Sequence, residues 1–176
     1  MYTDFVINNT IADRLQRLTR IAAGLTIAAA SIVLVGWIAD VEMLRSLIPG
    51  RVPMNPLSAI NFLVCGFELY ALERHLFASD ERRLGMIPAL LVVLTGGICV
   101  AGYLFDFNPV IDRLLFRDRL GTNRMAPNTA LAFVLSGGSL ALLARREARS
   151  ILAGQLLAIV AGGVALVAGL GYVYSV

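Results

Sequence analysis

Two short segments carry the side chains best suited to hydrogen bonding in this chain. Asn55 and Ser58 flank one proline, and Asn128 and Thr129 follow another. Proline is favoured in the first turn of a helix, whose backbone N–H groups and partial positive charge point out of the helix end. Amide and hydroxyl groups at such an end could bind a carbonyl, carboxylate or peptide oxygen of a ligand. The alternative is that they only cap the two helices.

These residues lie in a segment that occurs twice. Residues 54–66 reappear as residues 125–137, with Met, Pro, Ala, Phe and Gly matching in register. The preceding apolar runs also match, because residues 36–40 parallel residues 102–106. A partial third copy is indicated by residues 171–174, which resemble residues 102–105. The chain is therefore predicted to repeat a unit of two membrane helices.

A stripe of small and polar residues runs through each copy of the repeated segment. At spacings of three and four residues, such side chains share one face of a helix. They allow close approach and hydrogen bonds between membrane helices, so one interpretation is a packing seam. The other is a polar-lined pocket that opens to the outer leaflet. The stripes consist of Ser58, Asn61, Cys65 and Glu68 in the first copy, and of Thr129, Ala132, Ser136 and Ser139 in the second.

Glu68 is the only acidic residue inside a predicted membrane span. An intramembrane carboxylate is costly, which makes Glu68 a candidate functional group, although it could instead snorkel to the inner surface. Asp40 and Asp106 are expected at the outer edge, where they either join a ligand site or pair with arginines of the outer loops. Trp37 and Tyr103 precede them at headgroup level, where aromatic rings are favoured, and both are also candidates for the ligand site.

The composition indicates an integral membrane protein. Hydrophobic residues make up 58% of the chain and charged residues 15%, below the roughly one quarter typical of soluble domains. Apolar runs of about 20 residues cross a bilayer. They predict five spans, at about 21–39, 56–72, 86–105, 127–144 and 151–174. Nine arginines flank the spans on one side and six on the other, which predicts a cytoplasmic N-terminus. The net charge of +3 reflects this bias, so no nucleic-acid partner is expected.

We therefore expect a single all-α integral membrane domain of five transmembrane helices, built from tandem parallel two-helix repeats. Residues 1–20 form a cytoplasmic or interfacial segment, repeat one covers about 21–74, and repeat two covers about 86–146. The third repeat, at about 150–176, lacks its second helix. This odd number of spans predicts an outer C-terminus and a chain that has been cut short.

The motif Met-x-Pro-x-Ser/Thr-Ala-x-x-Phe stands at residues 54–62 and 125–133. Together with the aromatic residue near the preceding outer helix end, it resembles the multi-span sensory regions of bacterial sensor histidine kinases and diguanylate cyclases. The resemblance covers the chain from about residue 18 onward. It implies a location in a bacterial inner membrane and a signal-transduction role, as in two-component systems, in which the domain detects a hydrophobic or amphipathic ligand or the state of the membrane. The implied partners are the lipid bilayer, a cytoplasmic kinase or cyclase output module, and further copies of the chain.

Two other functions are open at this point: a small transporter or channel built on the parallel repeats, and a membrane scaffold without a ligand. The sequence contains no nucleophile–base pair, metal-ligand cluster or phosphate-binding loop, so neither enzymatic activity nor a metal is expected. No cofactor is evident. A quinone-like or other lipophilic molecule would suit polar helix ends beside an apolar interior.

Overall fold

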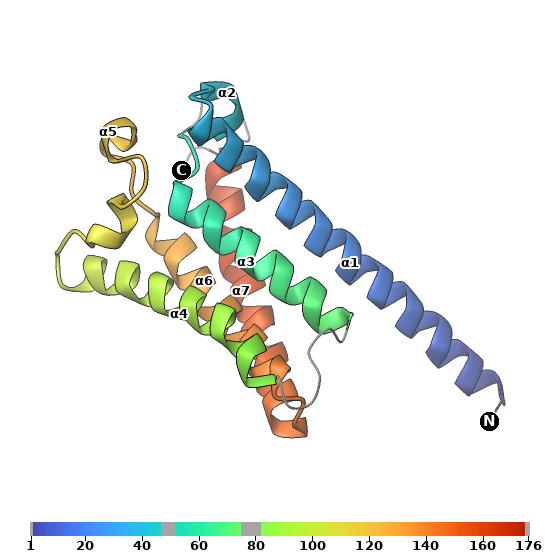
Figure 1. Cartoon of the computed structure of the whole chain (residues 1–176). Helices are drawn as coiled ribbons and strands as arrows, with labels where there is room; N and C mark the ends of the chain where they lie inside the picture. The colour runs from blue at the N-terminus through green and yellow to red at the C-terminus, as the bar shows by residue number, and fades with distance from the viewer. Residues whose placement is uncertain (1, 47–51, 75–81, 175–176) are drawn as a thin grey trace.

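The computed structural model describes residues 2–46, 52–74 and 82–174, and this part of the chain is all helical, with 82% helix and no strand. Five long helices are joined by short helical turns in the loops at one end (Figure 1). The expected all-α class is confirmed. The elements are α1 (Tyr2–Ile38), α2 (Glu42–Arg45), α3 (Pro56–Glu73), α4 (Arg82–Leu104), η2 (Val110–Arg113), α5 (Arg117–Leu120), α6 (Pro127–Ala144) and α7 (Ala148–Tyr174).

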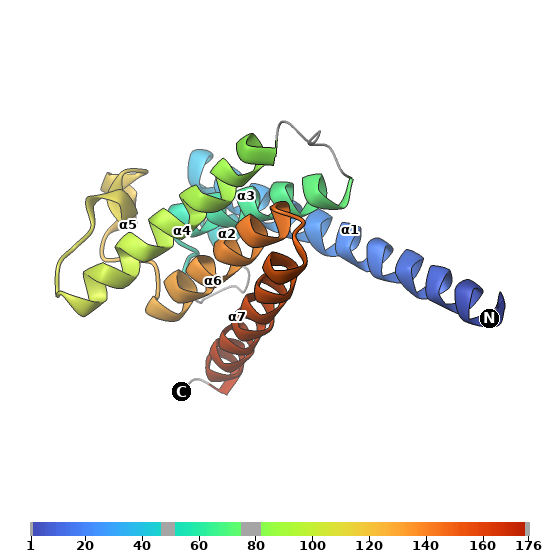
Figure 2. The same cartoon turned by 90° about the horizontal axis from the view of Figure 1, so that it is seen from below.

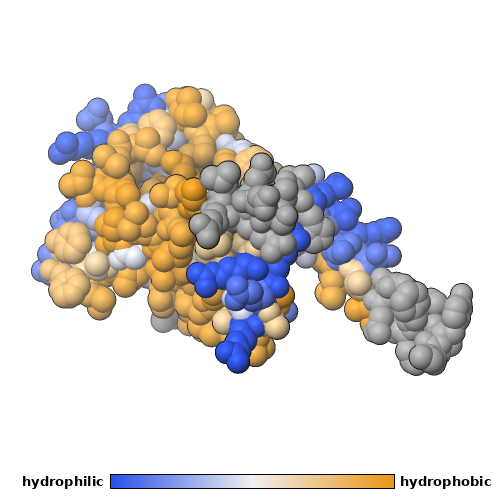
Figure 3. Space-filling model, turned by 60° about the horizontal axis from the view of Figure 1, so that its bottom comes forward, coloured by the Kyte–Doolittle hydropathy of each residue, from blue (hydrophilic) through white to orange (hydrophobic). Residues whose placement is uncertain are grey.

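Four helices in the described part of the chain are long and apolar enough to cross a membrane. The fifth expected span corresponds to α3, which has the same length as α6, 18 residues. It is not among the four, because Asn61, Glu68 and Glu73 make it more polar. Figure 3 shows hydrophobic residues over most of the visible face, with hydrophilic residues in separate groups toward its edges. These features indicate a membrane protein. The four segments are Ile11–Ile38, Met86–Leu104, Pro127–Ala144 and Ala148–Tyr174.

The first helix covers both the expected cytoplasmic or interfacial segment and the first expected span. α1 is a single helix of 37 residues, which extends about 55 Å, whereas the hydrocarbon core is about 30 Å thick. Its N-terminal end therefore reaches beyond the other helices (Figure 1). The helix continues through the expected membrane boundary near residue 20, because no glycine or proline interrupts the helical sequence there.

The long helices pack in pairs: α1 lies against α3, α4 against α6, and α6 against α7. Figure 2 shows α4 and α7 on opposite sides of α6. Arg20 Nε of α1 donates a hydrogen bond to Glu73 Oε1 of α3 at 2.8 Å, which ties this pair together at the C-terminal end of α3. α1 and α7 are not among the closely packed pairs of the described residues.

The α1–α3 and α4–α6 pairs each depend on a glycine at the same place in the repeated segment. A Cβ atom added to Gly66 would lie 3.3 Å from the backbone oxygen of Ala23, and one added to Gly137 would lie 2.7 Å from that of Ala89. Such glycines let two membrane helices approach closely. On the facing helices, a row of mostly small, buried residues completes the contact. We call these rows the seams: Ala23, Ala30 and Val33 in α1, and Ala89, Gly96 and Cys99 in α4.

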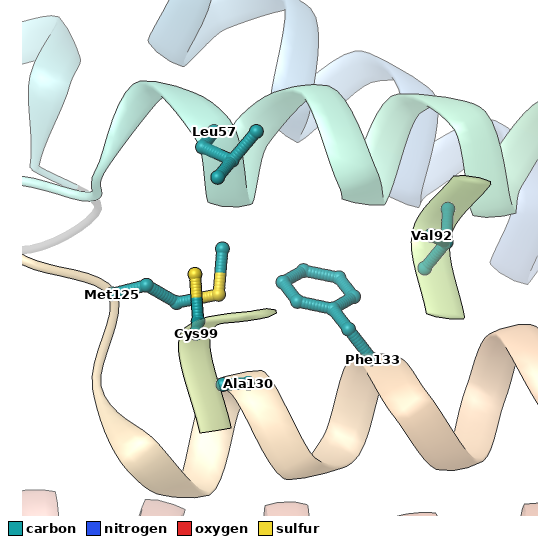
Figure 4. Packing of buried hydrophobic residues seen from close by; sticks show 6 residues of the cluster. All are labelled: Leu57, Val92, Cys99, Met125, Ala130 and Phe133. Carbon is teal, nitrogen blue, oxygen red and sulfur yellow. The ribbon is translucent and has the colours of Figure 1, made fainter. Parts of the chain in front are cut away.

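Helices α3 and α6 begin at the same end of the bundle and run in the same direction (Figure 4). Opposite directions would have contradicted the expected repeat. Between them, Phe133 of α6 packs in a buried cluster with Leu57 of α3 and Cys99 of α4. The rings of Phe62 and Phe133, which match in the repeated segment, meet edge to face with their centroids 4.8 Å apart. One cluster of the core thus lies where the two copies touch.

Candidate functional site

An aromatic side chain from the preceding long helix holds the start of each proline-started helix. Trp37 Nε1 in α1 donates a hydrogen bond to the backbone oxygen of Met54 at 2.9 Å. In the same way, the Tyr103 hydroxyl in α4 donates to the backbone oxygen of Met125 at 2.8 Å. Both residues were candidates for a ligand site at the outer helix ends. The structure places their polar atoms on the backbone of the protein instead.

The aspartates that follow these rings form matching turns. Asp40 and Asp106 both have left-handed backbone conformations, with φ of 59° and 52°, which Asp adopts more readily than most residues. The Asp40 carboxylate pairs with Arg45 and lies 3.6 Å from Arg119 Nη1. Arg45 also covers the Trp37 ring, with its Cζ 4.7 Å from the ring centroid. Asp40 therefore pairs with outer-loop arginines, as one of the two interpretations of the sequence expected.

Replacing Tyr103 with phenylalanine should destabilise the protein by about 0.5–1.5 kcal/mol, because the backbone oxygen of the buried Met125 loses a hydrogen bond. Thermal unfolding in lipid bicelles measures the change. Tyr174→Phe is the control, since Tyr174 is exposed at the end of α7 and should shift stability by no more than about 0.5 kcal/mol. Equal effects of both variants would show that the Tyr103 hydroxyl does not secure α6.

The two asparagines at the helix starts have different environments. Asn55 is the buried N-cap of α3, and its Oδ1 accepts a hydrogen bond from the Leu57 N–H at 2.8 Å. The equivalent N-cap of α6 is Ala126, which has no capping side chain. Asn128 is exposed within the first turn of α6, and its Oδ1 accepts from the adjacent Thr129 N–H at 2.9 Å. Asn55 thus acts as a cap, whereas Asn128 has an amide group open to an external partner.

Most of the polar stripe of α3 lies inside the bundle, except for Cys65, which is half-buried and lines the groove described below. Ser58, Asn61 and Glu68 are only 2–3% exposed. Asn61 Oδ1 accepts a hydrogen bond from the Thr95 hydroxyl of α4 at 3.1 Å. Asn61 Nδ2 and Glu68 Oε1 have no protein hydrogen-bond partner among the described residues. The snorkelling interpretation of Glu68 is wrong, because its side chain stays buried between helices.

The polar stripe of α6, by contrast, lines a groove of about 550 Å³. Residues from α3, α6 and α7 form its walls, together with Thr26 of α1. The rings of Phe62 and Phe133 and small side chains of α7 make the wall mostly apolar. Ser139 donates a hydrogen bond to the backbone oxygen of Gly154 at 2.8 Å, which joins the α6 and α7 walls. The polar groups that line the groove from α6 are Asn128, Thr129, Ser136 and Ser139.

The groove can accept an apolar molecule and offer it a few hydrogen-bond donors and acceptors. Among the described residues, no three His, Cys, Asp or Glu side chains come together as a metal site. The sequence did not point to Thr26 or to the α7 wall, because both reach the groove only through tertiary packing. Comparison with known proteins finds no matching family model, no matching curated protein and no matching solved structure.

Proposed function

We propose that this chain is a membrane-embedded signal-input domain. It detects a hydrophobic or amphipathic ligand, or the state of the membrane, and passes the signal to a cytoplasmic kinase or cyclase module. The observation that carries this proposal is the groove of about 550 Å³, whose walls come from both copies of the repeated segment. Its volume lies within the roughly 300–1,000 Å³ of small-molecule sites, and its lining is the usual mixture of apolar walls and a few polar groups.

The groove suits a ligand with an apolar body and a carbonyl group. The apolar body would lie against Phe62 and Phe133, and the carbonyl oxygen would accept from the Asn128 amide or the Thr129 hydroxyl. A quinone-like molecule has this chemistry. No cofactor is needed for such a role.

A ligand in the groove would signal through the helices that it contacts, which are α3, α6 and α7. α6 and α7 are joined by the hydrogen bond between Ser139 and Gly154, and α3 lies across the groove from α7. A ligand that binds one arrangement of these helices more tightly shifts the population toward it. The inner ends of the helices would carry that shift to the output module.

The proposal includes a particular topology. α3 is the fifth span, the two repeats are related by an axis along the membrane normal, and the N-terminus is in the cytoplasm of a bacterium. Support comes from the parallel α3 and α6 helices, the matching Gly66 and Gly137 contacts, and the arginine bias. A second copy of the chain is an expected partner. A transporter is less favoured, because none of the five long helices in the described chain is interrupted near its middle.

Replacing Asn128 with leucine should weaken binding of decylubiquinone, the probe for a quinone-like ligand, by about 2- to 12-fold. The loss of one hydrogen bond, worth about 0.5–1.5 kcal/mol, accounts for this range. Binding is measured by the rise in unfolding temperature of the bicelle-embedded protein as the probe is titrated. Fatty acid and menaquinone probes are tested in parallel.

Asn55→Ala is the matched control for Asn128→Leu. It removes the N-cap of α3 and should lower stability by about 0.5–2 kcal/mol without changing probe affinity. Asn128→Leu should leave stability nearly unchanged, because Asn128 is exposed. If none of the probes stabilises the protein, or if both variants lower stability equally, the groove is not the ligand site proposed here.

A further inference from the structure

Helix α7 carries the same seam as α1 and α4. Alignment of residues 102–103 with residues 171–172 places three small residues of α7 at the seam positions. In α1 and α4 these positions are buried, whereas in α7 the first two are exposed and the third is half-buried. All three line the groove. They are Ala158, Ala165 and Ala168.

The two buried seams are covered by helices of one kind. α3 covers the seam of α1 and α6 covers that of α4, and both run in the same direction. Each begins with a proline and has a glycine ten residues later, at Gly66 and Gly137. These glycines face Ile27 of α1 and Val93 of α4. The matching residue of α7 is Gly162, where an added Cβ would meet nothing within 4 Å.

We infer that the groove is the seat of a third helix of the α3 and α6 kind, which lies outside residues 1–176. The helix starts with a proline, runs parallel to α3 and α6, and places a small residue against Gly162. It would cover the α7 seam as α3 and α6 cover theirs.

The shape of the groove fits a helix. Its α7 wall extends from Ala158 to Ala168, roughly 15 Å along the helix axis. Small residues along this wall allow a helix backbone to approach closely. The opposite wall contains both central rings, Phe62 and Phe133, where the two existing copies meet.

The start of α6 also indicates a missing neighbour. Leu57, the second residue of α3, is buried in a cluster with Met125 and Phe133 of the next copy. Asn128, the second residue of α6, instead lies exposed in the groove. A third helix in the seat would cover Asn128 as α6 covers Leu57.

The seat is inferred from packing alone, so it does not depend on the proposed function. The helix seat and the proposed ligand site can belong to one domain if the groove is occupied by one or the other. An amphipathic ligand at Asn128 and Thr129 would displace the start of the third helix. Occupation of the groove by ligand would then loosen the helix, which gives the domain two states.

The test uses a dye-labelled synthetic peptide of residues 123–146 as the nearest available helix of this kind, titrated against the protein in bicelles. Fluorescence anisotropy should show saturable binding. Ala165→Leu in the protein should weaken it at least tenfold, because the new side chain fills the seat. Val167→Leu, on the exposed outward face of α7, should change it less than twofold. Gly137→Leu in the peptide should also abolish binding.

Thermal unfolding checks that Ala165→Leu is folded, and Gly162→Leu replaces it if it is not. Absence of saturable peptide binding, or equal binding to the Ala165→Leu and Val167→Leu proteins, would overturn the inference. The inference would also be overturned if the protein associates with itself in the absence of peptide and Ala165→Leu abolishes this association. The groove would then be occupied by a second copy of the chain. Decylubiquinone binding, measured separately, reports on the proposed function and distinguishes its failure from that of the seat.

Discussion

Gly137→Leu is expected to destabilise the protein by about 3 kcal/mol or more and to separate α4 from α6. Even a single Cβ atom at this position would lie 2.7 Å from the backbone oxygen of Ala89 and 2.9 Å from Cγ2 of Val93. A backbone atom cannot move aside as a flexible side chain can, so the whole helix must shift. Unfolding in bicelles, followed by circular dichroism, measures the loss.

Two other glycines make the expected order of effects testable. Gly66→Leu should be less damaging, because its closest contact at 2.7 Å is the Ile27 side chain, and the backbone of Ala23 is 3.3 Å away. Gly97→Leu in α4 should be neutral or stabilising by up to about 1 kcal/mol, since an added Cβ meets nothing within 4 Å and leucine favours the helix. If Gly97→Leu is as damaging as Gly137→Leu, close packing of α4 on α6 is not the cause.

The starts of α3 and α6 could be predicted because their causes are local. Pro56 and Pro127 stand at the first helical positions, as the sequence indicated. The ends of α1 and α4 fall within about a residue of the expected ones for a similar reason, since an aspartate in a left-handed turn follows each. The beginning of α1 was not predictable in this way. A helix can continue into water with charged residues, so arginines mark the edge of the membrane and not the end of the helix.

The candidate site could be predicted only in part. The polar stripe of α6 lines a pocket, which was one of the two interpretations of its spacing. The α3 stripe has the same spacing, yet Ser58 and Asn61 are buried against other helices. Spacing shows which side chains share a face, but the neighbouring helix decides whether that face is covered. The seam of α7 could not be predicted from the sequence, because small residues are common in membrane helices. It is recognised only when the matching residues of α1 and α4 are seen to be buried.

Glu68→Met is expected to stabilise the protein by about 1–3 kcal/mol. Methionine has a similar length and suits an apolar interior, and the change removes a buried carboxyl oxygen that has no protein partner among the described residues. The repeat offers a control with the opposite sign. Ser139 stands at the matching position of α6, and its hydroxyl is bonded to the Gly154 oxygen. Ser139→Ala should therefore destabilise by about 0.5–1.5 kcal/mol.

The opposite signs at two matching positions bear on the role of Glu68. A residue that costs stability in a membrane interior is retained where function requires it, because activity and stability often conflict at such sites. Ser139 secures α7, whereas Glu68 Oε1 has no hydrogen-bond partner among the described residues. If Glu68→Met raises the unfolding temperature and also weakens decylubiquinone binding, Glu68 acts in the signal-input function. If the variant is instead less stable than the natural protein, the carboxyl group has a stabilising partner and Glu68 is structural.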